Sequence, residues 1–171
     1  QGLVALMEIQ ASRLRARTDA AGRPILLLDQ DRGRWDRVLI GRGLAALERA
    51  HAIADALGAE HGPYALQAAI AACHARARTA AQTDWQQIAA QYDALALRVP
   101  SPVVALNRAV AVGMAFGAAA ALPLVDALAL EPTLQRYHLM HAVRAHLLNK
   151  LGRVAEAHEA LQHAAALTQN A

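Results

Sequence analysis

The sequence is poor in the residues that nucleophilic enzymes and disulfide-bonded proteins depend on. Its 171 residues include a single cysteine, Cys73, two serines, Ser12 and Ser101, and only 4% aromatic residues. One cysteine cannot form an intrachain disulfide, so we expect a reducing, cytoplasmic location. No serine or cysteine has an evident histidine and acid to activate it. The sequence therefore predicts a protein that is not an enzyme.

The chain also lacks a strong charge bias and long apolar runs. Residues 1–50 hold nine arginines and six acidic residues, and the remainder is balanced, giving a net charge of +3. Three excess charges interleaved with aspartates do not form a basic stripe, so we expect no direct nucleic-acid contact from this chain. The apolar run at residues 114–125 is broken by Gly117 and Pro123 and is rich in alanine. We therefore expect no membrane span.

Alanine, by contrast, is abundant, with 44 residues in the chain. It is the best helix former and is depleted in strands, so the sequence predicts an all-α fold. Apolar residues at three- and four-residue spacing, together with Gly, Pro and Asp at the ends, set the expected boundaries. The expected helices cover residues 3–16, 35–57, 63–80, 85–99, 103–115, 118–130, 133–150 and 153–168.

One region departs from this helical pattern. Asp19 and Gly22 are turn residues, and the apolar run at residues 25–28 follows Pro24, which predicts a small N-terminal β-hairpin around residues 15–28. The expected organisation is thus an N-terminal part, residues 1–34, with a helix, this hairpin and a polar segment, followed by a helical array over residues 35–171.

The helical array contains a degenerate repeat. Thr83, Gly117 and Gly152 are equivalent turn positions separated by 34 and 35 residues, close to the ~34 of tetratricopeptide repeats (TPRs). The last unit fits best, because Gly152 is followed by Arg153, Val154, Ala155, Glu156 and Ala157. We expect antiparallel helical hairpins stacked as a degenerate TPR-like array.

Residues 29–36 are the most distinctive motif and are called the 29–36 segment below. Three acids, two arginines and a tryptophan in eight residues predict a connected polar network in which arginines pair with carboxylates. Two interpretations remain open: the segment joins the hairpin to the first long helix, with Trp35 in the core, or it forms a docking surface. The candidate partner-binding residues are Asp29, Gln30, Asp31, Arg32, Arg34, Trp35 and Asp36.

A second candidate surface comes from the repeat frame. That frame places several polar residues on the inner faces of the first helices of two hairpins, which line the concave side of a solenoid. They either bind a short or acidic partner segment or simply face solvent. These residues are Asn107, Arg108, His146, Asn149 and Lys150.

Two further patterns are weaker. Residues 41–46, Gly-Arg-Gly-Leu-Ala-Ala, imitate a dinucleotide loop, but neither a second strand nor a suitably spaced acid follows. His158 and His163 are five residues apart, on nearly opposite sides of a helix, which does not suit a zinc helix. We therefore expect no cofactor and no metal.

Several segments together resemble a known family. They are residues 16–19 (Ala-Arg-Thr-Asp), the 29–36 segment, residues 62–72 from Gly-Pro-Tyr onwards, Thr83-Asp84-Trp85, and residues 100–111 from Pro-Ser-Pro onwards. In this order they resemble the TPR-like C-terminal extension of a subgroup of extracytoplasmic-function RNA polymerase sigma factors.

The resemblance covers nearly the whole chain and implies a regulatory role in transcription initiation. The sigma helical domains that bind polymerase and promoter would then precede Gln1, so this chain would be a fragment. Expected partners are those sigma domains in cis, the RNA polymerase core, or a further regulatory protein. A free-standing TPR-like scaffold that binds a partner peptide is the alternative.

Overall fold

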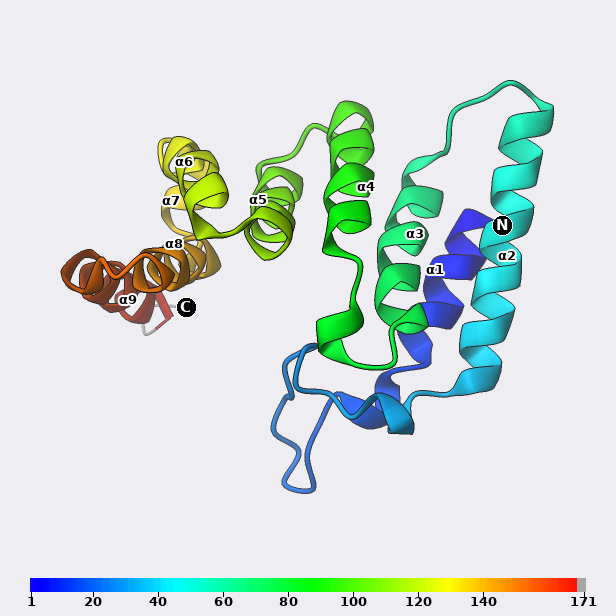
Figure 1. Ribbon diagram of the computed structural model, residues 1–171, viewed down its shortest axis with the longest axis horizontal. Coiled ribbons are helices and arrows are strands. Elements are labelled where there is room, and N and C mark those ends of the chain that lie inside the picture. The colour runs from blue at the N-terminus through cyan, green and yellow to red at the C-terminus, as the bar shows by residue number, and fades with distance from the viewer. Residues whose placement is uncertain (169–171) are drawn as a thin grey trace. The chain divides into compact units, whose positions relative to one another are not determined.

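The computed structural model describes residues 1–168, and within that range it contains nine α-helices, three short 3-10 helices and no β-strand. The predicted all-α class is therefore confirmed (Figure 1). The α-helices are α1 (Gly2–Ala11), α2 (Arg37–Ala56), α3 (Pro63–Arg76), α4 (Trp85–Arg98), α5 (Pro102–Phe116), α6 (Ala118–Leu128), α7 (Pro132–Gln135), α8 (His138–Lys150) and α9 (Val154–Thr168). The 3-10 helices are η1 (Leu14–Ala16), η2 (Arg32–Arg34) and η3 (Ala80–Gln82).

Short local signals fix several of the helix starts. The Asp36 carboxylate accepts the backbone N–H groups of Val38 and Leu39 at 2.9 and 3.1 Å and caps α2. Proline occupies the first helical position of α3, α5 and α7, where its missing N–H costs nothing. The single helix expected over residues 133–150 is wrong, because Tyr137 has an extended backbone (φ −92°, ψ 101°) and separates α7 from α8.

The predicted β-hairpin is also wrong. Residues 15–28 form one isolated antiparallel bridge, between Thr18 and Pro24. The Asp19 carboxylate accepts the backbone N–H groups of Ala21 and Arg23, both at 2.9 Å, which closes a tight turn. Proline has no N–H to extend a ladder, and Leu26 in the apolar run is 75% exposed, so no strand is buried here.

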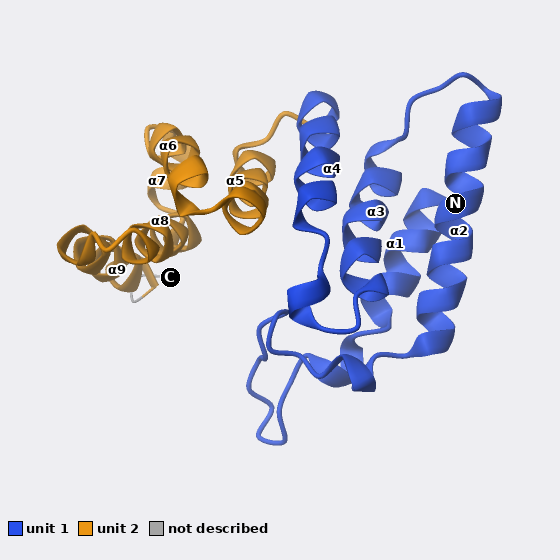
Figure 2. Cartoon of the chain, in the orientation of Figure 1, with its two compact units in different colours: residues 1–98 blue, residues 99–171 orange. Residues whose placement is uncertain are grey.

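The chain divides into two compact units, Gln1–Arg98 and Val99–Ala171 (Figure 2). The expected division fell after residue 34, so the expected N-terminal part lies inside the first unit. Within that unit α1 packs on both α2 and α3, and α3 also packs on α4. Ten of the fourteen residues of α3 are buried, most of them alanines.

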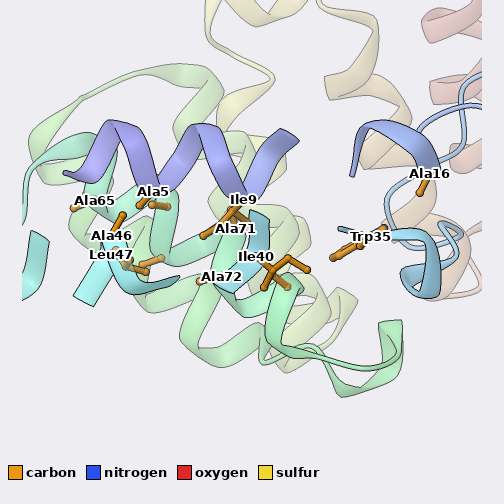
Figure 3. Packing of buried hydrophobic residues seen from close by; sticks show 13 residues of the cluster. Ala5, Ile9, Ala16, Trp35, Ile40, Ala46, Leu47, Ala65, Ala71 and Ala72 are labelled. Atoms are coloured by element: carbon orange, nitrogen blue, oxygen red, sulfur yellow. The ribbon is translucent and has the colours of Figure 1, made fainter. Parts of the chain in front are cut away.

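Glycine allows the helices of the first unit to approach closely. A Cβ at Gly43 of α2 would lie 2.6 Å from Ile9 Cγ1 and 3.1 Å from the Ala5 carbonyl oxygen, both in α1. Figure 3 shows Ala5 and Ile9 in the core formed with α2 and α3. Gly43 thus serves helix packing within residues 41–46, which lie inside α2 and form no strand-to-helix turn.

The second unit is built from two helix pairs. Helix α5 packs on α6, α6 on α8, and α8 on α9. Gly117 and Gly152 have φ values of +93° and +74° and stand between the helices of each pair, at the turn positions that the repeat predicted. The core residues include Leu122, Val125, Met140 and Leu148.

None of the helices in residues 1–168 has both the length and the apolar character needed to span a bilayer.

Candidate functional site

Arg32 is the buried anchor of the 29–36 segment. Its side chain reaches the end of α3 and the residues just before α4, and the residue is only 5% exposed. Nη1 donates to the carbonyl oxygens of His74 and Ala77 at 2.7 and 3.0 Å, and Nη2 donates to Thr83 Oγ1 at 3.0 Å. The two carbonyls lie at the C-terminal end of α3, where the helix dipole favours a cation. Arg32 thus caps α3 from another part of the chain.

Trp35 is the apolar anchor of the same segment. It is 3% exposed and belongs to the core formed with α1, α2 and α3. The guanidinium carbons of Arg32 and Arg13 lie 5.1 and 5.7 Å from the centre of its ring, within cation–π range. The side chain is therefore part of the core and is unavailable to a partner.

The predicted connected network is wrong. The Asp31 carboxylate accepts the Gly33 N–H at 2.8 Å, and the Asp36 carboxylate caps α2. Gln30 Nε2 donates to the Ile25 carbonyl oxygen at 3.1 Å. In residues 1–168 no carboxylate of the segment pairs with Arg32 or Arg34. Asp31 and Asp36 accept backbone N–H groups close by in sequence, while Arg32 donates to carbonyls at the end of a helix.

Fewer residues of the 29–36 segment are exposed to solvent than the seven predicted to bind a partner. Asp29, Asp31 and Arg34 are exposed, Asp36 and Gln30 are half-buried, and Arg32 and Trp35 are buried. A loop without regular secondary structure is thus held by Arg32 and Trp35 and displays three exposed charges, Asp29, Asp31 and Arg34.

The surroundings of Arg32 are cationic. Burial and the charges of Arg32 and Arg13 lower the pKa of His74 to about 4, so the ring is neutral at pH 7. Burial, with Arg17 and Arg32 nearby, lowers the pKa of Arg13 to about 10. The His74 ring lies edge-on to the Trp85 ring, with centroids 5.2 Å apart. A charged imidazolium beside Arg32 and Arg13 would be repelled by both guanidinium groups, and the neutral imidazole avoids this repulsion.

The second candidate surface is only partly assembled. His146 and Asn149 of α8 line a hollow of about 360 Å³ between α8 and α9, together with His158, Val154 and Leu161. Asn107 is exposed and Arg108 half-buried on α5, Lys150 is exposed at the end of α8, and none of these three lines the hollow. The structure therefore brings together two of the five residues predicted for this surface.

Sequence reasoning missed two histidine relationships. His158 of α9 lines the hollow, whereas the surface predicted from the repeat frame contained residues from the first helices of the hairpins. His141 of α8 stacks on His163 of α9 with ring centroids 4.1 Å apart, and His141 Nε2 lies 2.8 Å from the Gln135 carbonyl oxygen. The stacking depends on the contact between α8 and α9, which the spacing of the histidines does not reveal. Within residues 1–168 no three His, Cys, Asp or Glu side chains are arranged to hold a metal ion.

Comparison with known proteins gives two matches. Residues 1–51 match a family described as a family of unknown function (DUF6596), so the match includes α1, the 29–36 segment and most of α2. An uncharacterized protein of Rhizobium meliloti (strain 1021) is 48% identical over 170 residues, which cover 99% of this chain and 38% of that protein. The chain thus spans little more than a third of the curated relative, and no solved structure matches it.

Proposed function

We propose that this chain is a regulatory, protein-interaction domain of a bacterial extracytoplasmic-function RNA polymerase sigma factor. It would act in the cytoplasm, without catalysis, by binding the sigma domains of its own chain or the polymerase core. The sequence resemblance described above is the source of the sigma-factor assignment. The 48% identical relative supports the idea of a module within a larger protein, since the match covers 38% of its length.

The observation that carries an interaction role is the construction of the 29–36 segment. Arg32 makes three hydrogen bonds to the α3–α4 region and Trp35 is buried, so the loop backbone is held at both points. Exposed Asp29, Asp31 and Arg34 are then displayed in a fixed arrangement. Preorganised charges on a loop lose little conformational entropy on binding, which favours docking.

The packing of the second unit agrees with a TPR-like array. Helices α5 and α6 form one pair and α8 and α9 another, with positive-φ glycines between the members of each pair and contact between α6 and α8. Arrays of this kind commonly serve as binding surfaces for other proteins.

The test of this proposal uses the full-length protein that contains this chain. Asp29→Ala combined with Arg34→Ala removes two exposed charges, and we expect several-fold weaker promoter-directed transcription with RNA polymerase core in a run-off assay. The urea midpoint should stay unchanged because exposed substitutions rarely alter stability by more than ~0.5 kcal/mol. Glu48→Ala with Arg49→Ala, exposed neighbours on α2, is the matched control. Unaltered transcription by the first variant would overturn docking through this segment.

A free-standing scaffold that binds a partner peptide is the second candidate function. The hollow between α8 and α9 favours it, because Val154 and Leu161 provide apolar contacts beside the polar groups of His146, Asn149 and His158. The coding sequence upstream of Gln1 separates the two functions: sigma helices there favour the regulatory domain, and an initiator codon close to Gln1 favours the scaffold.

A further inference from the structure

A polar hollow of about 510 Å³ lies in the first unit between the end of α3 and the start of α4. Cys73 and Arg76 of α3 line it on one side, Gln87 of α4 on another, and residues of the connecting loop complete it. The loop residues are Ala77, Arg78, Gln82 and Asp84. None of these residues belongs to the 29–36 segment or to the hollow between α8 and α9.

The charges around this hollow are unbalanced. Arg76 and Arg78 are exposed, and in residues 1–168 neither forms an ion pair with a carboxylate. The one acid in the lining, Asp84, already accepts the Gln87 backbone N–H at 2.9 Å as it caps α4. The lining thus includes two arginines and one carboxylate that is already hydrogen-bonded, and the amides of Gln82 and Gln87 add further donors.

The loop that lines the hollow is held by hydrogen bonds from Arg32, which is not itself part of the lining. Arg32 bonds the Ala77 carbonyl oxygen and Thr83 Oγ1, so it fastens both ends of the loop that carries Arg78 and Gln82. Two other lining residues are also in contact, because the Cys73 thiol lies 3.6 Å from Gln87 Oε1. Burial and the charge of Asp84 raise the pKa of this thiol, whereas the charge of Arg76 lowers it. These effects agree with Arg76 and Asp84 lying near the thiol.

The geometry points to this hollow as a binding site for a carboxylate side chain of an acidic peptide segment. Planar guanidinium groups bind carboxylates through paired hydrogen bonds, and two of them are available. Asp84 reduces the excess positive charge, which favours a singly charged carboxylate over a doubly charged phosphate. A volume of about 510 Å³ has room for an acidic side chain and for a short piece of the peptide that carries it.

This site does not depend on the 29–36 segment as a docking surface, and it names the chemistry of a partner that the proposed function leaves open. The acidic segment could belong to a sigma domain or to another protein. A binding assay on the purified 171-residue chain therefore tests the site without any transcription readout, and either proposal can fail while the other holds.

The probe is a labelled tetraglutamate peptide with blocked ends, followed by fluorescence anisotropy at low salt. We expect saturable binding that weakens as ionic strength rises, and no binding of the matching tetraglutamine peptide. Arg76→Gln with Arg78→Gln should weaken binding about tenfold or more, since each lost hydrogen bond to a charged group contributes on that scale. The control Arg15→Gln with Arg49→Gln removes the same charge from two other exposed positions and should bind almost as the parent does.

A second variant moves the affinity in the opposite direction. Asp84→Asn keeps a residue able to cap α4 but removes the opposing charge, so peptide binding should tighten by a few fold. If the Arg76/Arg78 and Arg15/Arg49 double variants lose equal amounts of peptide affinity, the attraction is non-specific and the proposed site is overturned. The same holds if inorganic phosphate binds more tightly than the peptide, or if Asp84→Asn weakens binding in a chain with an unchanged circular dichroism spectrum.

Discussion

In the first unit, Gln1–Arg98, six of the ten buried residues of α3 are alanines, whereas in the second unit the buried residues of α8 include Met140, Leu147 and Leu148. The buried polar residues differ as well. The first unit buries Ser12, Arg32, His74 and Thr83, and among the described residues of the second only His141 is both polar and buried.

This difference has a physical consequence. Small side chains let helices approach closely but bury little apolar surface per residue, so the packing around α3 depends more on directional contacts such as those of Arg32. The larger buried side chains of α8 each bury more apolar surface. We therefore expect the first unit to respond to the removal of hydrogen bonds and to pH, and the second to respond to lost apolar volume.

The largest expected effect is in the first unit. Arg32→Ala should lower the free energy of unfolding by about 3–5 kcal/mol, because truncation leaves three buried acceptors unpaired and removes the cation beside Trp35. Arg34→Ala is the control, since Arg34 is exposed two residues away, and it should change stability by no more than ~0.5 kcal/mol. Urea unfolding followed by circular dichroism measures both. Similar losses of stability in the two variants would contradict the role of Arg32 as the buried anchor of the 29–36 segment.

The second prediction tests the apolar core of the other unit. Met140 is fully buried, so Met140→Ala should cost about 3 kcal/mol, whereas Leu139→Ala, at a residue 46% exposed, should cost much less. Both tryptophans, Trp35 and Trp85, lie in the first unit. In Met140→Ala the circular dichroism transition should therefore begin at lower urea while tryptophan fluorescence keeps the parent midpoint. A fluorescence transition that moves equally would show that the units unfold together.

The third prediction concerns pH. The folded protein keeps His74 neutral down to a pKa of about 4, whereas the unfolded chain takes up the proton near pH 6.5. Stability from the neutral ring is therefore complete above about pH 6.5 and falls as pH drops from there towards 4, by about 2–3 kcal/mol in total.

Urea midpoints measured between pH 7 and pH 4 test this dependence. His74→Gln should flatten the fall in stability, and the exposed control His158→Gln should leave it unchanged. A slope that is the same in His74→Gln and in the parent would assign the acid sensitivity to other groups.

The smallest effect tests the close packing of α1 on α2. Gly43→Ala should lower stability by about 1–2 kcal/mol, because the new Cβ would lie 2.6 Å from Ile9 Cγ1. Gly41→Ala, in the same helix with no atom within 4 Å of the added Cβ, should instead raise stability by about 0.5–1 kcal/mol. Thermal unfolding of the pair gives the sign of each change. A stabilised Gly43→Ala variant would contradict close packing as the reason for this glycine.

Parts of this molecule followed from the sequence because they depend on neighbouring residues. Alanine content predicted the helical class, Asp84 and the prolines predicted helix starts, and Gly117 and Gly152 predicted the turns between helices. The β-hairpin prediction failed because an apolar run after Pro24 was interpreted as a strand, although its residues have no partner strand to bury them.

The tertiary structure alone decided where long side chains go. The sequence placed Arg32 among three acids and favoured an arginine–carboxylate network, but the fold brings the ends of α3 and α4 to Arg32, 42 to 51 residues away in the chain. The hollow lined by Arg76 and Arg78, and the stacking of His141 on His163, likewise need helix packing. Local propensities and caps act over a few residues and can be predicted from them, whereas contacts between distant residues depend on how the helices pack.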